Sequence, residues 1–527
     1  MSSDFEIDCE TPSSISADSA ASEQTTMGDF GCAIPGLEIS GLDKQRLTYG
    51  LNAKETMAPK LVIVMVGLPA RGKSYISKKL ARYLNWLQFE TRVFNAGQTR
   101  REALVPQSEG DLPSNAHLSH PAKFFDPDDT DAVTRRDEIA LRTLDDLLSW
   151  LQQARSSVGI LDATNSTVQR RQAVLDRIRR KAGPSVELLF LESCCYDHDL
   201  LEKNVQLKLS GPDYRQHEVE SALADFRRRI ELYERKYTSM DKSEDEKEFP
   251  YLQLIDVGRR VIANCINGFL SAQAAEYLLN FRLHERQIWI TRNGESLDDV
   301  EGRIGRNSLL SSKGTKFASA LSAFIKEQRR VWEMKKGHQT YNEKSRIENR
   351  TVATSVDSDK RLASPGFQVW TSIMAQAIET SQFFDEDEYK VRNFRMLNDL
   401  HAGKMEGLTF AEISRVHSDE MTIRRQNPVH YRWPGSGGES YADVIHRLRP
   451  IIMELERLED HVLLITHRAV ARVLLAYFQE LNWEAITEVE VPPGRVFCVE
   501  PVSAVQSHLA LTVENLSANA LRRDLME

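Results

Sequence analysis

Eight residues near the start of the chain have the types and spacing of a phosphate-binding loop. They read Gly67-Leu-Pro-Ala-Arg-Gly-Lys-Ser74, with two glycines and a final Lys-Ser pair. Gly67 and Gly72 allow the backbone to fold back so that successive N–H groups point at phosphate oxygens. Lys73 can reach the terminal phosphates, and the Ser74 hydroxyl can ligate magnesium. This segment therefore predicts a site for a nucleotide and its magnesium ion.

The residues on either side supply the elements that such a loop needs. An unbroken apolar run, Leu61 to Val66, predicts a buried parallel strand that stops at Gly67. Beyond the loop, apolar residues from Ile76 to Leu87 recur at helical spacing. The N-terminal end of this helix, with its unpaired N–H groups, then faces the nucleotide.

The chain continues as an alternation of apolar runs and helical stretches. The runs are Thr91–Asn95, Val158–Asp162, Val186–Leu191 and Leu252–Asp256, and a helical stretch covers Asp137–Ala154. Strands that alternate with helices predict an α/β fold, with a mostly parallel sheet covered by helices on both faces. Ligands of such sheets bind at the carboxyl ends of the strands.

Charged residues follow several of these strands. Asp162 ends its strand, where a carboxylate can hold magnesium or accept the proton of an attacking hydroxyl. Arginines occur at Arg100-Arg101, at Arg170-Arg171 and at 227–229, the last in a helix that ends near Tyr233. Because arginines bind phosphate bidentately, their convergence would form a second phosphate site. The acceptor implied is a phosphorylated small molecule.

A second alternation begins near Gln287. Ile288–Thr291, Val369–Ser372 and Val462–Thr466 predict buried strands of another α/β domain. A polar, charged stretch, 329–367, is interpreted as a surface insertion or mobile loop outside the core.

Composition limits the classes of function. The 527 residues are 41% hydrophobic and carry a net charge of -9, which argues against a nucleic-acid binder. No apolar run is long enough to span a membrane, no leader is apparent, and six scattered cysteines suggest neither zinc nor disulfides, so a cytoplasmic protein is expected. Residues 1–40 lack Lys and Arg and are rich in Ser and Thr, which predicts a disordered acidic tail. Its serines are either targets of regulatory protein kinases or without a specific role.

Several motifs together resemble the bifunctional 6-phosphofructo-2-kinase/fructose-2,6-bisphosphatases over about residues 58–510. The motifs are Gly67–Ser74, Ala81–Trp86, Arg100–Glu102, Asp162–Asn165, Gly211–Tyr214, Ile255–Arg259, Gly438–Tyr441 and Leu474–Phe478. The resemblance implies a P-loop kinase domain with a mostly parallel sheet, followed by a histidine-phosphatase, phosphoglycerate mutase-like α/β domain. The domains expected are an acidic tail (1–57), the kinase (58–283), the phosphatase-like domain with its insertion (284–510) and a C-terminal tail (511–527).

The resemblance implies that the first domain transfers the γ-phosphoryl of ATP to the 2-hydroxyl of fructose 6-phosphate. Residues matched to catalysis are Lys73, Asp162 and Lys208, with Ser74 and Asp162 as magnesium ligands. Residues matched to ATP and magnesium binding are Gly67, Ala70, Arg71, Gly72, Lys73, Ser74, Tyr75 and Asn204. Residues matched to fructose 6-phosphate are Arg100, Arg101, Thr164, Arg170, Arg229 and Tyr233. The cofactor implied is Mg2+, and the assembly implied is a homodimer.

The second domain departs from the family at its nucleophile. The family reads R-H-G, whereas this chain reads Arg292-Asn293-Gly294. An amide nitrogen has its lone pair delocalised into the carbonyl, so Asn293 cannot form the phosphorylated intermediate. Gln376 stands at an expected arginine and Asp399 at an expected glutamate, with further changes at Asp299, Phe410, Pro428 and Arg468. Retained positions are Arg292, Glu295, Arg424, Tyr441, His467 and Arg472.

These departures predict a kinase-dominant enzyme that barely hydrolyses its product. One alternative is a working bifunctional enzyme in which His467 or another residue takes over the phosphatase chemistry. A second is a non-catalytic sensor of ATP and sugar phosphate, and a third is a P-loop kinase with a different small-molecule acceptor.

Overall fold

The computed structural model describes residues 59–103, 122–154, 156–214, 218–240, 248–348, 366–501 and 510–515. They belong to one compact unit, Met57–Glu527. The expected acidic tail therefore lies outside the described residues. Within the described residues, no helix combines the length and apolar character that crossing a membrane requires.

The first sheet has six strands in the order β2-β3-β1-β4-β5-β6. Their bounds are β1 Lys60–Val66, β2 Glu90–Asn95, β3 Ser157–Asp162, β4 Val186–Cys194, β5 Tyr251–Ile255 and β6 Arg260–Asn264. All neighbours pair in parallel except β5 and β6, which are antiparallel. The mostly parallel sheet is thus confirmed, and the antiparallel edge strand β6 is an addition that the sequence patterns did not predict.

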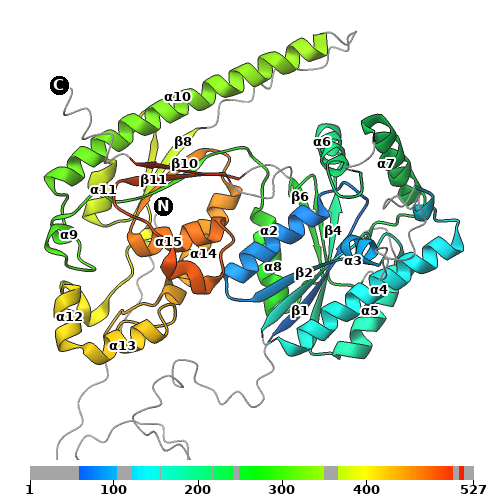
Figure 1. Cartoon of the computed structure of the whole chain (residues 1–527), viewed down its shortest axis with the longest axis horizontal. Helices are drawn as coiled ribbons and strands as arrows, with labels where there is room; N and C mark the ends of the chain where they lie inside the picture. The colour runs from blue at the N-terminus through cyan, green and yellow to red at the C-terminus, as the bar shows by residue number, and fades with distance from the viewer. Residues whose placement is uncertain are drawn as a thin grey trace, which may run out of the picture. The chain divides into compact units, whose positions relative to one another are not determined.

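Central strand β1 is buried on both faces because helices cover both sides of this sheet (Figure 1). Its odd-numbered residues from Leu61 to Met65 pack with α2 (Lys73–Trp86) and α8 (Phe269–Asn280). The alternate residues, Val62 to Val66, pack with α4 (Thr130–Gln153) and α5 (Val168–Ala182). This period-two division explains why the sequence shows a continuous apolar run rather than an alternation. The remaining helices are η1 Ala122–Phe125, α3 Ala96–Glu102, α6 His198–Leu209 and α7 Val219–Glu234.

The second sheet also has six strands, in the order β12-β11-β7-β10-β8-β9. Their bounds are β7 Ile288–Arg292, β8 Phe367–Thr371, β9 Lys390–Asn393, β10 His461–Thr466, β11 Arg495–Glu500 and β12 Ala510–Asn515. The α-helices are α9 Leu297–Glu301, α10 Ser312–Glu348, α11 Ala375–Ser381, α12 Phe410–Val416, α13 Ser418–Gln426, α14 Tyr441–Arg457 and α15 Arg468–Phe478. The short 3-10 helices are η4 Arg395–Leu397, η5 Gly403–Met405 and η6 Trp483–Glu488. A second α/β region is therefore confirmed.

Two boundaries differ from the sequence expectation. Helix α10 continues to Glu348, so the first part of the stretch 329–367 is helical rather than a loop. The core residues Phe317, Leu321 and Ile325 of α10 all precede this part of the helix, so apolar periodicity did not indicate it. Ion pairs one turn apart, such as Arg329 with Glu333, support it instead. Strand β12 reaches Asn515, five residues into the expected C-terminal tail, because it pairs with β11. Residues 349–365 lie outside the description.

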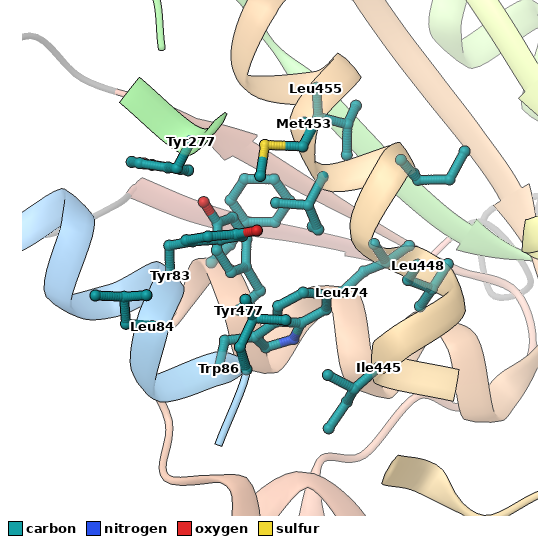
Figure 2. Packing of buried hydrophobic residues seen from close by; sticks show 14 of the residues in the cluster. Tyr83, Leu84, Trp86, Tyr277, Ile445, Leu448, Met453, Leu455, Leu474 and Tyr477 are labelled. Atoms are coloured by element: carbon teal, nitrogen blue, oxygen red, sulfur yellow. The ribbon is translucent and has the colours of Figure 1, made fainter. Parts of the chain in front are cut away.

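Helix α2 connects the nucleotide loop to the second α/β region. Figure 2 shows Tyr83 and Trp86 of α2 among side chains of α14 and α15, including Leu448 and Tyr477. The indole N–H of Trp86 donates to the Val473 carbonyl at 3.3 Å. The last turn of α2 is therefore packed into the core of the second region.

A buried ion pair lies at the centre of this contact. Arg82 Nη2 donates to Glu456 Oε1 at 2.6 Å, and the two side chains are 2% and 5% exposed. The Tyr477 hydroxyl donates to the same carboxylate at 2.5 Å, and the Arg82 guanidinium lies over the Tyr477 ring at 4.4 Å. Although burial raises the pKa of Glu456, the charges of Arg82, Lys79 and Arg286 lower it on balance. The carboxylate is thus ionised and paired.

Removing this carboxylate charge should destabilise the protein. Glu456→Gln leaves the Arg82 guanidinium buried without an opposite charge, at a cost of about 3–5 kcal/mol. We expect a clearly lowered midpoint in thermal unfolding. The matched control is Glu231→Gln, because Glu231 pairs with Arg228 on the exposed surface of α7 and should leave the midpoint unchanged. Equal midpoints for both variants would contradict this account of the contact.

Candidate active site

A cleft of about 1170 Å³ opens at the carboxyl ends of β1, β2 and β3. Its wall contains all but one of the residues that the sequence assigned to the kinase site. These are Ala70, Arg71, Gly72, Lys73, Ser74, Tyr75, Arg100, Arg101, Asp162, Thr164, Arg170, Asn204, Lys208, Arg229 and Tyr233. The cleft lies where the rule for parallel sheets places a ligand.

Gly67 is the exception, because it does not line the cleft. Its N–H donates to the Thr164 carbonyl at 2.9 Å and so is not free for a phosphate. Its φ is 134°, and a Cβ added at this position would lie only 2.6 Å from the Ser193 carbonyl oxygen, so glycine is needed here. Gly67 therefore shapes the loop.

Lys73 begins α2 and is held inside the loop. Gly72, at a φ of 89°, turns the chain into the helix, and Lys73 Nζ donates to the Leu68 carbonyl at 2.6 Å. Lys73 is 8% exposed, and burial lowers its pKa to about 7 although the negative charge of Asp162 opposes the change. An ammonium in this state gains much from a nearby phosphate.

Three of the expected sugar-phosphate arginines share one carboxylate. Asp213 lies 2.7 Å from Arg100, 3.2 Å from Arg101 and 3.6 Å from Arg229. Although burial raises the pKa of Asp213, these arginines lower it on balance. Asp213 belongs to the Gly211–Tyr214 motif, but the sequence assigned it no role. Its carboxylate thus connects the arginines of α3 with the arginine of α7.

Three arginines of the cleft have hydrogen-bond donors without an acceptor. The Nε atoms of Arg100, Arg170 and Arg229 are buried and make no hydrogen bond within the described residues. Burial lowers the pKa of Arg170 to about 10, with Arg136 contributing, whereas Tyr233 opposes the change. Each of these guanidinium groups has a carboxylate partner, Asp137 for Arg170 and Asp213 for the other two, but a buried Nε without an acceptor is costly, and a phosphate oxygen is a suitable acceptor.

Two residues that the sequence did not single out also organise this wall. The Arg229 guanidinium lies 3.8 Å from the centre of the Phe125 ring, and that of Arg100 lies 5.4 Å from it. Asn95 ends β2 and donates to Asp162 Oδ2 at 2.5 Å. The sequence could have indicated Asn95, because a polar residue at the carboxyl end of a parallel strand is a candidate ligand-site residue. Phe125 follows no predicted strand, so no sequence pattern marked it.

The implied magnesium ion suits the donors present. Ser74 and Asp162 line the same cleft with a hydroxyl and a carboxylate, and Mg2+ prefers oxygen ligands of this kind together with substrate phosphates. Asp162 is 5% exposed, and its Oδ1 has no hydrogen-bond partner in the described part of the chain. The two residues therefore fit the ion.

Several of the residues that the sequence assigned to a degenerate phosphatase site lie near the ends of β7, β8 and β10. Asn293 is 7% exposed, its N–H donates to the Thr466 carbonyl, and its side-chain amide donates to the Gly294 carbonyl, both at 2.8 Å. Gln376 accepts from the Ser308 N–H and donates to the Arg306 carbonyl, both at 3.2 Å. The two substituted amides thus bond to neighbouring backbone.

His467 is buried at the end of β10 beside Ser372, with Nε2 and Oγ 2.8 Å apart. Burial lowers the pKa of His467, although Asp399 opposes the change. Asp399 accepts from the Leu400 N–H at 2.8 Å. A neutral imidazole beside a short carboxylate is a weak proton donor for a leaving group.

The retained cations and their partners surround this position. Arg472 donates to the Tyr441 hydroxyl at 3.1 Å and to the Val489 carbonyl at 2.8 Å. Burial lowers the pKa of Arg292, and the charges of Asp299 and Asp399 oppose the change. Arg424 lies over the Trp433 ring at 5.3 Å, and Glu295 pairs with Lys313 at 2.9 Å. The structure therefore brings six residues of the predicted set within electrostatic range of one another without a histidine nucleophile: Arg292, Asp399, Arg424, Tyr441, His467 and Arg472. Glu295 and Gln376 bond to other neighbours.

Comparison with known proteins gives two family matches. A family model described as 6-phosphofructo-2-kinase matches residues 49–285, and one described as the histidine phosphatase superfamily (branch 1) matches residues 345–509. The second match begins beyond Asn293.

Relatives match most of the chain. 6-phosphofructo-2-kinase 1 of Saccharomyces cerevisiae is 46% identical over 88% of this chain, which spans about half (53%) of that relative. A probable 6-phosphofructo-2-kinase of Schizosaccharomyces pombe is 41% identical over 86% of this chain and 69% of the relative. Human 6-phosphofructo-2-kinase/fructose-2,6-bisphosphatase 3 is 36% identical over 87% of this chain and 77% of the relative.

Both regions of the chain are thus matched, and the cleft geometry agrees with the first match. The chain belongs to the 6-phosphofructo-2-kinase/fructose-2,6-bisphosphatase family and carries that family's ATP-dependent kinase domain followed by a histidine-phosphatase domain.

Proposed function

We propose that this chain transfers the γ-phosphoryl of ATP to the 2-hydroxyl of fructose 6-phosphate and so makes fructose 2,6-bisphosphate, a regulator of glycolysis. The proposal rests on the set of residues that line one cleft. This cleft combines a nucleotide loop, a carboxylate and a group of arginines whose buried Nε atoms lack acceptors within the described residues. A kinase acting on a sugar phosphate needs these three parts together.

Each part has a role in the transfer. Lys73 and the loop hold the nucleotide phosphates, and Asn204, which donates to the Ala70 carbonyl at 3.0 Å, supports the loop. Asp162 accepts the proton of the attacking hydroxyl, and Lys208 balances charge on the transferring group. Arg100, Arg101, Thr164, Arg170, Arg229 and Tyr233 hold the sugar phosphate. Ser74 and Asp162 would hold Mg2+, which would supply positive charge to neutralise the phosphates.

We also propose that the second site has lost its hydrolytic chemistry. The support is chemical: the amide of Asn293 is no nucleophile, and Gln376 brings no positive charge to a transferring phosphate. Direct attack by water leaves at most a trace of activity.

The proposal extends to organisation. Residues 58–283 form the kinase domain, and the phosphatase-like domain runs from 284 to the end of β12 at Asn515. The cysteines Cys195 and Cys498 are free thiols and buried, which suits a reducing cytoplasm. The assembly is a homodimer, and serines of the N-terminal tail are substrates for regulatory protein kinases.

A paired assay tests the main proposal. The purified protein with Mg-ATP and fructose 6-phosphate should form fructose 2,6-bisphosphate. Lys73→Met should lower kcat by on the order of 10²–10³-fold, since it removes a charge that stabilises the transferring phosphoryl group. Binding of ATP and sugar phosphate without product formation would instead favour a non-catalytic sensor.

Nucleotide binding should take up a proton above neutral pH. Because burial lowers the pKa of Lys73 to about 7, this amine is mostly neutral at pH 8, and adjacent phosphates favour its charged form. Calorimetry in buffers of different ionisation enthalpy should therefore show uptake approaching one proton per site at pH 8 and little at pH 6. Affinity should weaken as pH rises above 7. The control is Lys73→Met, in which the difference between the two pH values should vanish.

Restoring the nucleophile alone should not restore the phosphatase. Asn293→His supplies a nitrogen nucleophile but leaves Gln376 and Asp399 in place, so hydrolysis of fructose 2,6-bisphosphate should rise only partly. Adding Gln376→Arg and Asp399→Glu should raise it further. Substantial steady hydrolysis by the unmodified protein would refute the proposed loss and direct attention to His467.

A further inference from the structure

One side chain bridges the carboxylate and the arginine helix of the cleft. Asn95 Nδ2 donates to Asp162 Oδ2 at 2.5 Å, while Asn95 Oδ1 accepts from the N–H of Gln98 at 2.9 Å. The second bond caps the N-terminus of α3, the helix that carries Arg100 and Arg101. Asn95 thus connects Asp162 to the first turn of α3, the helix that carries two of the expected sugar-phosphate arginines.

The sheet places these two side chains together. Asn95 is the last residue of β2, Asp162 is the last of β3, and the two are register partners in parallel pairing. Register partners on adjacent strands project to the same face, so the contact follows from the pairing itself. Figure 1 shows α3 continuing directly from β2 toward the cleft end of the sheet.

The partners also dictate the residue type. A carboxylate can only accept a hydrogen bond, whereas a backbone N–H can only donate one. The residue between them must therefore offer a donor on one side and an acceptor on the other, as an Asn amide does. Asp would keep the cap but set two carboxylates against each other, and Ser would keep the cap but lack the donor reach. Gly97 leaves the space, since a Cβ added at that position would lie 2.9 Å from Asn95 Oδ1.

We propose that Asn95 is a positioning residue for the phosphoryl transfer: it sets Asp162 and helix α3 at a fixed separation in the cleft. The inference rests on the proposed function. With Oδ2 engaged by Asn95, Asp162 presents Oδ1 to the magnesium ion or to the sugar hydroxyl. The same amide holds the first turn of α3 at a fixed position relative to that oxygen. The arginine pair Arg100-Arg101 is positioned with this helix. Misplacing a reacting group by about 1 Å can cost on the order of 10²-fold in rate.

Three variants separate the two bonds. Asn95→Ser retains a capping oxygen but loses the bond to Asp162, so kcat should fall 10- to 100-fold with the KM for fructose 6-phosphate within about twofold of wild type. Asn95→Ala loses both bonds, so the KM for fructose 6-phosphate should rise as well.

Asn95→Asp tests the donor alone. The new carboxylate can still cap α3, but it cannot donate to Asp162, and its negative charge repels that carboxylate. We expect kcat to fall at least as far as in Asn95→Ser, while hydrogen exchange of α3 stays as in wild type.

The matched control removes a helix cap elsewhere. Asp129 caps α4 by accepting from the N–H groups of Asp131 and Ala132, so Asp129→Ala should leave kcat and the KM for fructose 6-phosphate unchanged. Hydrogen exchange of α3 in the ligand-free protein adds a readout independent of activity: Asn95→Ala should exchange faster, and Asn95→Ser should match wild type.

The outcomes are distinguishable. Wild-type protein that makes no fructose 2,6-bisphosphate would overturn the proposed function. An active wild type with unchanged kcat in Asn95→Ser, unchanged kcat in Asn95→Asp, or equal exchange of α3 in Asn95→Ala would overturn the inference about Asn95 and leave the proposed function standing.

Discussion

Burial of positive charge is the constraint on which this structure depends. Helix α2 contains two buried cations, and the structure compensates their burial in different ways. At its first residue, Lys73 is nearly inaccessible and bonds only a loop carbonyl, so its pKa falls to about 7. Near its end, Arg82 is equally buried but is paired with Glu456. A buried cation with a full partner anchors the fold, whereas one without a partner is ready for an anionic ligand. The same helix thus serves as scaffold at one end and as binding site at the other.

The two sites of the chain differ in the groups that surround a ligand position. In the cleft, guanidinium groups are packed against Phe125 and around Asp213, and the Nε atoms of three arginines have no acceptor within the described residues. In the second site, the Nε of Arg292 also lacks an acceptor there, but the amides of Asn293 and Gln376 bond to nearby backbone carbonyls. The protein itself satisfies these substituted amides, which agrees with the proposed loss of phosphatase chemistry.

Packing also explains why a domain with altered catalytic residues is retained in the structure. Helices α14 and α15 supply Glu456 and Tyr477 to the Arg82 cluster and Val473 to Trp86. The helix that begins at the nucleotide loop therefore ends inside the core of the phosphatase-like region. Loss of that region would expose apolar surface of α2 and leave Arg82 without its partner.

The sequence by itself determined the strand, loop and helix around Gly67–Ser74 and the two successive α/β regions. It could do so because these features are local: glycine spacing, apolar periodicity and residues that follow a strand are readable within short windows. Through the family resemblance, the sequence also named the kinase-site residues that line the cleft, Gly67 excepted. Only the tertiary structure decided that Arg82 meets Glu456, 374 residues away, that Asn95 meets Asp162, and that Phe125 lies under two arginines. It also decided that α10 extends to Glu348 and that β12 completes the second sheet. Such partners are selected by sheet register and by the need to compensate buried charge, and neither is expressed in the local pattern of residues.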